Sequence, residues 1–206
     1  MGLVHATATL APTKQELLEA WLPSRPWASG AGAVEKVGEY RFDDPLGEVG
    51  IETILWRTAD ESVLQVPFTY RSAPLDGAEE FLVGTTEHSV LGPRWVYDGC
   101  ADPVWAASVA GAILTGGTEA QMVIERGGET VAVPPRVPVR GSGAPGATVP
   151  EILGVDSVRD DGPVTVVVAG GLTLSLARVV GTPLSGSATL TGSVGEHDLG
   201  VLVVLG

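Results

Sequence analysis

Apolar and polar side chains alternate with a period of two in three consecutive segments, and that pattern is typical of half-buried β-strands. The connections at residues 43–47 and 58–61 are short enough for hairpins. The pattern therefore predicts an antiparallel meander. The positions that share one face are Tyr40 and Phe42 in the first segment, Val49, Ile51, Thr53 and Leu55 in the second, and Leu64, Val66, Phe68 and Tyr70 in the third.

A short amphipathic helix is predicted ahead of this meander. Thr13 and Glu16 have the spacing of a capping box, and Pro23 ends the helical pattern. Between them, Leu17, Leu18, Trp21 and Leu22 fall on one helical face. Residues 3–10 alternate weakly and are expected to form a first strand. The helix should lie with its apolar face on the sheet.

A second helix is predicted from Pro103. Asp102 offers a side-chain oxygen to the free N–H groups of a helix start, and Pro103 suits the first helical position. From residue 104 to residue 114 the only polar side chain is Ser108, and a helix that is apolar all round belongs in an interior. Residues 115–117, Thr-Gly-Gly, supply the stop.

The middle of the chain predicts one more hairpin, formed by residues 120–125 and 130–139 around Gly127 and Gly128. Its second strand contains three prolines, at positions 134, 135 and 138, which favour a sheet edge or an exit from the sheet. Residues 140–150 are rich in Gly, Ser and Pro and are expected to be a loop or linker.

The C-terminal third is rich in glycine and valine: residues 141–206 contain 13 of each. Strand-like runs occur at 164–169, 172–180, 188–194 and 200–205, separated by glycine turns. The predicted fold class is α+β, a helix packed on a curved antiparallel sheet, followed by this antiparallel β segment. We expect a domain over residues 1–140, a linker over 141–150 and a β-rich segment over 151–206, which either completes that domain or stands alone.

The balance of charges argues against several classes of partner. The chain of 206 residues has 25 acidic and 12 basic side chains and a formal charge of −13. A negative field repels phosphate backbones and anionic lipids, so nucleic acid and membrane surfaces are not expected as partners. The N-terminal residues lack the pattern of a signal peptide, no run of about 20 apolar residues occurs, and Cys100 is the one cysteine. These features favour the cytoplasm.

A search for catalytic motifs gives little. Gly141, Gly143 and Gly146 form a literal G-x-G-x-x-G, but Pro145 and Pro150 exclude the helix that a dinucleotide site needs. The chain has no asparagine and only two lysines, Lys14 and Lys36, which argues against a self-sufficient kinase. The histidines and Cys100 lack zinc-site spacing, so no metal site and no cofactor are expected, and Cys100 is interpreted as a buried thiol.

Four polar residues near strand ends are the candidate ligand-binding site: Arg71, His88, Arg94 and Asp98. They combine both signs of charge with neighbouring aromatic side chains, a combination that suits a phosphorylated or hydroxylated small molecule. The simpler interpretation is that Arg94 and Asp98 pair with each other or cap neighbouring turns. No catalytic residue is proposed. The five tryptophans could present stacking surfaces for sugar rings, although the pattern assigns most of them to the core.

Several short motifs carry a resemblance to a known family. They are Trp21-Leu22-Pro23 with Arg25 and Trp27, the strand from Val66 to Arg71, and Trp95-Val96-Tyr97-Asp98 leading to Asp102-Pro103. In their order and spacing, across about residues 10–115, the chain resembles the N-terminal cap domain of actinobacterial maltokinases and related sugar kinases. It departs from that pattern at Pro26, which separates an arginine and a tryptophan expected to be adjacent.

The resemblance implies a cap fold that sits beside the nucleotide-binding part of a kinase, whose catalytic lobes would follow it. In these 206 residues the Gly/Val-rich segment follows instead, and no catalytic motif has a matching position. We therefore expect a non-catalytic cap-like protein of glucan or trehalose metabolism. It would dock on a sugar kinase or another enzyme of that pathway, or bind a carbohydrate-related ligand. The alternative is a small enzyme or small-molecule-binding module with its pocket near Arg71, His88, Arg94 and Asp98.

Overall fold

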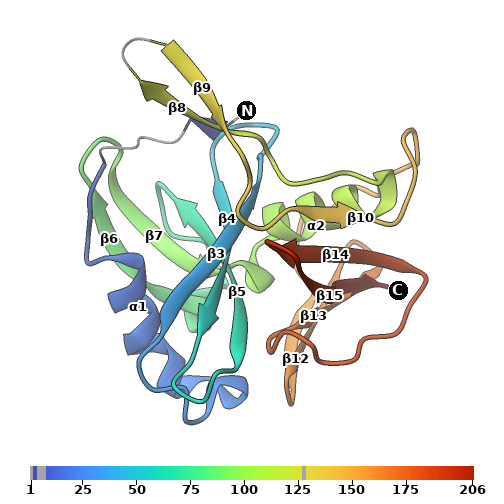
Figure 1. The fold of residues 1–206 in the computed structure, drawn as a ribbon, viewed down its shortest axis with the longest axis horizontal. Helices are drawn as coiled ribbons and strands as arrows, with labels where there is room; N and C mark the ends of the chain where they lie inside the picture. Colours follow the sequence, from blue (N-terminus) through green and yellow to red (C-terminus); the bar gives the residue numbers. More distant parts are fainter. Residues whose placement is uncertain (1, 4–7, 127–128) are drawn as a thin grey trace.

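Two antiparallel sheets and a helix between them form most of the molecule (Figure 1). The computed structural model describes residues 2–3, 8–126 and 129–206. Strands make up 44% of the structure and helices 17%, so the fold is mostly β. No helix in these three ranges is long and apolar enough to cross a membrane.

The first sheet has six strands in the order β2-β6-β7-β5-β4-β3. All neighbours in it are antiparallel. The predicted meander is confirmed as β3, β4 and β5, whereas β6 was not predicted because its glycine and threonines weaken the alternation. The strands are β2 (Leu10–Ala11), β3 (Glu35–Phe42), β4 (Gly50–Arg57), β5 (Val63–Arg71), β6 (Leu82–His88) and β7 (Gly92–Asp98).

The second sheet also has six antiparallel strands, in the order β10-β14-β15-β13-β12-β11. The four predicted C-terminal runs are confirmed as β12 to β15. The edge strand β11 was missed because its sequence, SVRDD, is mostly polar. The strands are β10 (Val139–Gly141), β11 (Ser157–Asp161), β12 (Val164–Ala169), β13 (Leu172–Ala177), β14 (Ala188–Val194) and β15 (His197–Leu205).

A third, three-stranded sheet has the order β1-β8-β9, with β1 (Gly2–Leu3) parallel to β8 (Met122–Arg126). The predicted hairpin is confirmed as β8 and β9 (Glu129–Val133), and β9 is the edge strand. The proposed turn at 127–128 lies outside the described residues. So does most of the expected first strand at 3–10, of which the structure describes Leu3 in β1 and residues 8–10.

Helix α1 (Lys14–Trp21) covers one face of the first sheet, and its capping box is confirmed. The hydroxyl of Thr13 accepts a hydrogen bond from the Glu16 amide at 3.2 Å, and the Glu16 carboxylate accepts one from the Thr13 amide at 2.8 Å. Two short 3₁₀ turns follow, η1 (Leu22–Ser24) and η2 (Pro26–Ala28). The apolar face of the helix joins a cluster that includes Leu18, Ile54 and Phe68.

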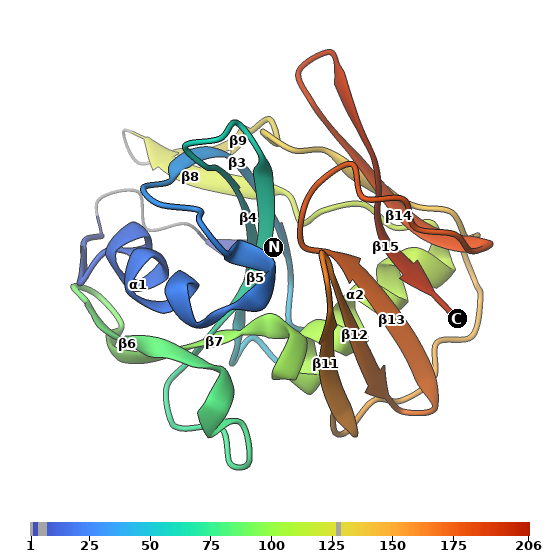
Figure 2. The ribbon, with the colours of Figure 1, turned by 90° about the horizontal axis from the view of Figure 1, so that it is seen from below.

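Helix α2 (Pro103–Thr115) lies between the two large sheets (Figure 2). Its start and stop are confirmed: Asp102 accepts from the Val104 amide at 2.9 Å, and Gly116 ends the helix with a φ of 68°. The first sheet is thus packed by a helix on each face. Two further 3₁₀ turns are η3 (Glu79–Phe81) and η4 (Gly99–Ala101). The cluster around α2 draws on both sheets, with Phe42, Ile51 and Leu55 from the first and Val167, Leu174, Leu190 and Leu202 from the second.

The start of β5 connects the sheets through the backbone. The Gln65 amide donates to the carbonyl of Arg178 at 2.8 Å, and the Val180 amide donates to the carbonyl of Val63 at 2.8 Å. The Gln65 side chain also donates to the carbonyls of Ala177 and Leu202, at 3.0 and 3.1 Å. Because these bonds accompany a shared hydrophobic cluster, we propose that residues 151–206 complete the same domain as the first sheet.

Gly141 and Gly143, the first two glycines of the G-x-G-x-x-G motif, lie against the C-terminal end of α2. The Gly143 amide donates to the Ile113 carbonyl at 2.8 Å, and the Ala144 amide donates to the Leu114 carbonyl at 3.1 Å. A Cβ atom on Gly143 would overlap the Leu114 carbonyl oxygen. These glycines therefore allow a close backbone approach that satisfies carbonyls left free at the helix end.

This packing predicts that Gly143→Ala lowers the free energy of unfolding by about 2 kcal/mol or more, since overpacking a tight contact typically costs 1–3 kcal/mol. Urea denaturation of the two proteins measures the difference. Gly154→Ala is the matched control, because Gly154 has open space around its Cβ position. Equal losses in the two variants would contradict the packing role of Gly143.

Candidate functional site

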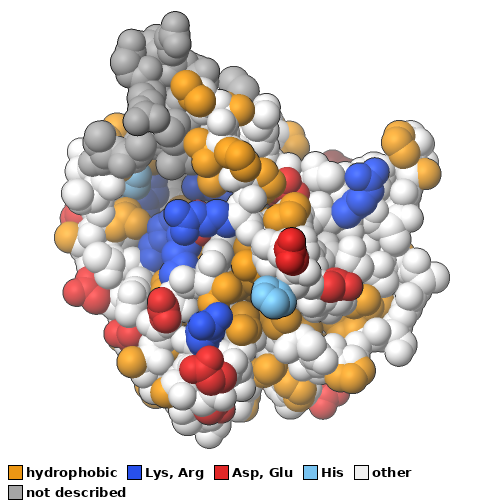
Figure 3. Space-filling view, viewed as in Figure 1, with side chains coloured by type: hydrophobic (Ala, Val, Ile, Leu, Met, Phe, Trp, Pro, Cys, Tyr) orange, Lys and Arg blue, Asp and Glu red, His pale blue; other side chains and the backbone are white. Residues whose placement is uncertain are grey.

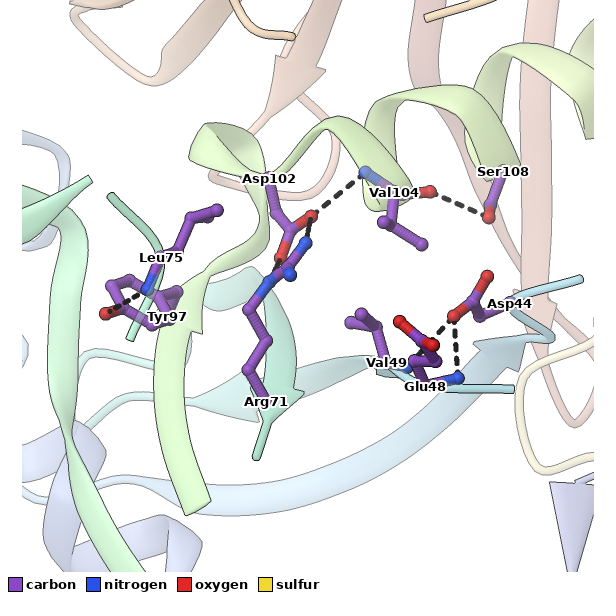
Figure 4. A network of polar contacts seen from close by, with 9 residues as sticks. All are labelled: Asp44, Glu48, Val49, Arg71, Leu75, Tyr97, Asp102, Val104 and Ser108. Atoms are coloured by element: carbon purple, nitrogen blue, oxygen red, sulfur yellow. Dashed lines mark hydrogen bonds and ion pairs between the residues drawn. The ribbon is translucent and has the colours of Figure 1, made fainter. Parts of the chain in front are cut away.

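Arg71, the last residue of β5, holds the N-terminal end of α2 (Figure 4). Its Nε and Nη2 atoms donate to the two carboxylate oxygens of Asp102, each at 2.7 Å. Asp102 is fully buried, whereas the Arg71 side chain is 20% exposed. The hydrogen bond with Asp102 raises the pKa of Arg71. The guanidinium thus serves chiefly to position the residue that caps α2.

Two loops are fixed beside this ion pair (Figure 4). The Asp44 carboxylate accepts from the amides of Glu48 and Val49, each at 2.9 Å, which shapes the turn between β3 and β4. The hydroxyl of Tyr97 accepts from the Leu75 amide at 3.0 Å. The polar groups in this region therefore mainly bond to backbone and order the chain around the helix start.

Asp98, the last residue of β7, belongs to a different buried network. It does not pair with Arg94 as the simpler interpretation held: its Oδ2 accepts from the Arg178 guanidinium at 2.5 Å. It does cap the next turn, because its Oδ1 accepts from the Cys100 amide at 3.2 Å. Arg178 is fully buried, donates to Thr165 at 2.7 Å and lies over the Trp27 ring at 4.5 Å. The network therefore joins the first sheet to the second.

The thiol of Cys100 lies within this network, 3.3 Å from the Arg178 guanidinium. It is fully buried, and burial raises its pKa well above the ordinary value for a thiol. The interpretation as a buried thiol is confirmed. The core assignment of most tryptophans is also confirmed, since Trp21, Trp27, Trp56 and Trp105 are buried and Trp95 is partly exposed.

His88 and Arg94 lie at the turn between β6 and β7. The His88 Nδ1 accepts from the amides of Val90 and Leu91, at 3.2 and 3.1 Å. Arg94 donates to the carbonyl of Pro93 at 2.8 Å. Both side chains are partly exposed, and the His88 ring orders the turn through its bonds to the two amides.

Strand pairing separates the four predicted site residues. Arg71 pairs with Trp95, whereas Asp98 pairs with Phe68. Because successive side chains point to opposite faces of a sheet, Arg71 and Asp98 lie on opposite faces. The structure therefore does not bring the four residues into one constellation, and a ligand pocket near them stays a prediction.

A hollow of about 380 Å³ lies elsewhere, at the β10 and β14 side of the second sheet, and none of the four residues lines it. Its polar lining includes Thr118, Glu119, Arg140, Thr191, Ser193 and Asp198. Within the ranges that the structure describes, no group of three or more His, Cys, Asp or Glu side chains is arranged to hold a metal ion.

A further group of charged residues surrounds Glu52 on the face of the first sheet that carries α1. We call Lys14, Lys36 and Arg41 the basic cluster. The Glu52 carboxylate accepts from Lys14 at 2.5 Å and from the Tyr70 hydroxyl at 2.8 Å. Sequence reasoning missed this group, although the signal was present: the chain has only two lysines and both are in it.

The electrostatics of Glu52 are set by opposing effects. Its side chain is nearly fully buried, and burial alone would raise the carboxyl pKa. The positive charges of the basic cluster and the hydrogen bond from Lys14 outweigh burial and lower the pKa from 4.5 to about 2. Burial and the neighbouring Glu52 charge raise the pKa of Tyr70 well above its ordinary value. Glu52 is thus ionised at neutral pH and Tyr70 is protonated.

Comparison with known families confirms the resemblance. Residues 21–102 match the model of the maltokinase N-terminal cap domain. The match runs from the last residue of α1 to the residue that caps α2, and so includes η1, η2 and β3 to β7. A search among curated proteins found no match.

The lowered pKa of Glu52 predicts acid sensitivity. The folded carboxyl titrates at about 2 and the unfolded one near 4.5, so the unfolded state binds the proton more readily. The stabilisation is complete above the unfolded value and is lost as the pH falls through the folded value, with a total on the order of 3 kcal/mol. Urea denaturation between about pH 6 and pH 2.5 measures this loss.

Glu52→Gln should flatten that dependence, because the amide does not titrate. Glu48→Gln removes an exposed carboxylate from the turn before β4 and should leave the dependence unchanged. A Glu52→Gln curve that runs parallel to the wild-type curve over this range would show that Glu52 is not the group responsible.

Proposed function

We propose that this chain is a non-catalytic, cap-type module that docks on the catalytic lobes of a maltokinase-type sugar kinase. The observation that carries the proposal is the match of residues 21–102 to the maltokinase N-terminal cap domain. Sugar phosphorylation requires groups that bind phosphates and magnesium. In this module the matching segment supplies a packed sheet and its turns, and the kinase lobes supply the reactive groups.

The charged residues of the matching segment support a structural role. Arg71 is paired with Asp102, and Asp98 is paired with Arg178. Three of the four tryptophans in this segment, Trp21, Trp27 and Trp56, are buried. These paired or buried side chains stabilise the sheet and the helix. The exposed turns are therefore the part of this segment that would contact a partner.

The docking surface that we propose is the end of the first sheet where the β3–β4 and β6–β7 turns lie. Tyr70 and Arg71, at the end of β5, pair with Gly50 and Trp95, so both turns extend beyond the same end of the sheet. These turns expose large apolar side chains: Leu46 is 81% exposed, Val90 56% and Leu91 48%. Exposed apolar groups rimmed by polar residues are typical of contact sites between proteins.

The alternative is the binding of a carbohydrate-related ligand. The hollow lined by Glu119, Arg140 and Asp198 favours it, because convergent polar side chains can hold a hydroxyl-rich molecule. This hollow lies outside residues 21–102, which is why docking is the better-supported proposal.

Docking through the turns predicts that Leu46→Asp and Leu91→Asp weaken association with a purified maltokinase-type kinase about tenfold or more, since each places a charge where an apolar contact is expected. Isothermal titration calorimetry measures the dissociation constants. Melting temperatures should stay near the wild-type value, because both side chains are exposed.

Leu153→Asp is the matched control. Leu153 is also 81% exposed but lies outside residues 21–102, so its replacement should leave the affinity unchanged. Equal weakening by all three replacements would contradict docking through the turns. A lack of association with any maltokinase-type kinase, together with stabilisation by maltose or trehalose, would favour the carbohydrate alternative.

A further inference from the structure

The basic cluster is unusual in a chain of this charge. The protein has 12 basic side chains and a formal charge of −13, yet Lys14, Lys36 and Arg41 all act on the one carboxylate of Glu52. Figure 3 shows lysine and arginine side chains gathered on the face that contains the first sheet. Such a concentration of cations provides a local site for an anion within an acidic protein.

The strands and α1 bring these side chains to the same face. Arg41 pairs directly with Glu52 across β3 and β4, and Lys36 pairs with Trp56. Trp56 and the neighbouring Ile54 belong to the cluster under α1, so Lys36, Arg41 and Glu52 all face the α1 side. The ammonium group of Lys14, in the first turn of α1, contacts the Glu52 carboxylate on this same face of the sheet.

Both lysines of the basic cluster are paired with carboxylates. Lys14 is paired with Glu52, and Lys36 lies 2.5 Å from a carboxylate oxygen of Glu39. Among residues 2–3, 8–126 and 129–206, the Arg41 guanidinium has no side-chain hydrogen bond and no ion pair within 4.0 Å. It is partly exposed, as are the side chains of Lys14 and Lys36, at 28% and 37%.

We propose that Arg41, assisted by Lys36 and Lys14, binds a phosphate group, either as inorganic phosphate or as a small phosphomonoester. The planar fork of an arginine matches two oxygens of a phosphate, and the ammonium groups of lysine act as nearby point charges. Glu52 and Tyr70 hold Lys14 in place from the protein side. This site is independent of the docking surface at the turns.

The net charge of the protein does not prevent such binding. At physiological ionic strength the screening length is about 8 Å, so carboxylates on distant surfaces contribute little to the potential at Arg41. The adjacent Lys14 ammonium is partly buried and is screened less by salt, whereas Lys36 is exposed. The local sign of charge therefore decides which ions the site attracts.

Calorimetric titration of the full chain with sodium phosphate and with glycerol 3-phosphate, at an ionic strength held constant with sodium chloride, tests the proposal. Saturable binding is expected in the wild type. Arg41→Gln should weaken it about tenfold or more, because it removes a charge-assisted bidentate contact. Lys36→Gln should weaken it by a smaller factor.

Arg57→Gln is the matched control. Arg57 is an exposed arginine of β4, five residues beyond Glu52 and on the opposite face of the strand, so its replacement should not change the affinity. Circular dichroism checks that each variant retains its fold. Tighter binding of glycerol 3-phosphate would identify a phosphomonoester as the ligand, whereas equal or tighter binding of inorganic phosphate would identify the free ion.

Three results would overturn the proposal. The first is an absence of saturable binding by either phosphate compound to the wild type. The second is an affinity that Arg41→Gln and Lys36→Gln leave unchanged. Binding of acetate with the same affinity as phosphate would also exclude a site built for a phosphate group.

Discussion

The apolar helix α2 sets the constraint on which the rest of the fold depends. Its side chains Trp105, Ala106, Val109, Ala110 and Ile113 form one broad face that is essentially inaccessible to water, and no residue of the helix is exposed. Burial of a large apolar side chain contributes about 1.5–3 kcal/mol, so a helix of this kind must be covered on several sides. The first sheet covers part of the surface of α2, and the second sheet covers the rest. The two sheets are therefore held together by the helix that both of them need.

Polar contacts at the borders of this core fix its position. Arg71 and Asp102 hold the first turn of α2, and Gly143 approaches its last turn. Between the sheets, Arg178 is buried against Asp98 and Trp27. A buried charge is costly unless it is paired and hydrogen-bonded, so these contacts define one arrangement of the sheets more than they add to net stability. The same pairing gives Arg71 and Asp98, both near strand ends, different partners on opposite faces of the sheet.

Residues close together in the sequence were enough to predict where both helices begin and end. Thr13 with Glu16, and Asp102-Pro103 followed by an apolar run and Gly116, specify helix ends through contacts within a few residues, and the structure shows both. Strands with clear alternation were also predicted. The strand β11 was missed because its side chains are mainly polar and lie at a sheet edge, where little burial is needed.

The candidate site was harder to predict because it depends on register and on contacts across long stretches of sequence. Arg71 and Asp98 both lie at strand ends, but only the pairing of β5 with β7 shows that they face opposite sides. The partner of Asp98 is 80 residues away, in a segment whose place in the fold the sequence left open. The basic cluster depends in the same way on the pairing of β3 with β4 and on the placement of α1.

Equilibrium unfolding followed by two probes tests most directly whether both sheets form one unit around α2. All five tryptophans lie between Trp21 and Trp105, so their fluorescence reports on the first sheet and α2, while far-ultraviolet circular dichroism reports on both sheets. Coincident transitions are expected, because neither sheet can leave α2 without exposing its apolar surface. A circular dichroism transition that precedes the change in fluorescence would show that the second sheet unfolds on its own and would contradict this account.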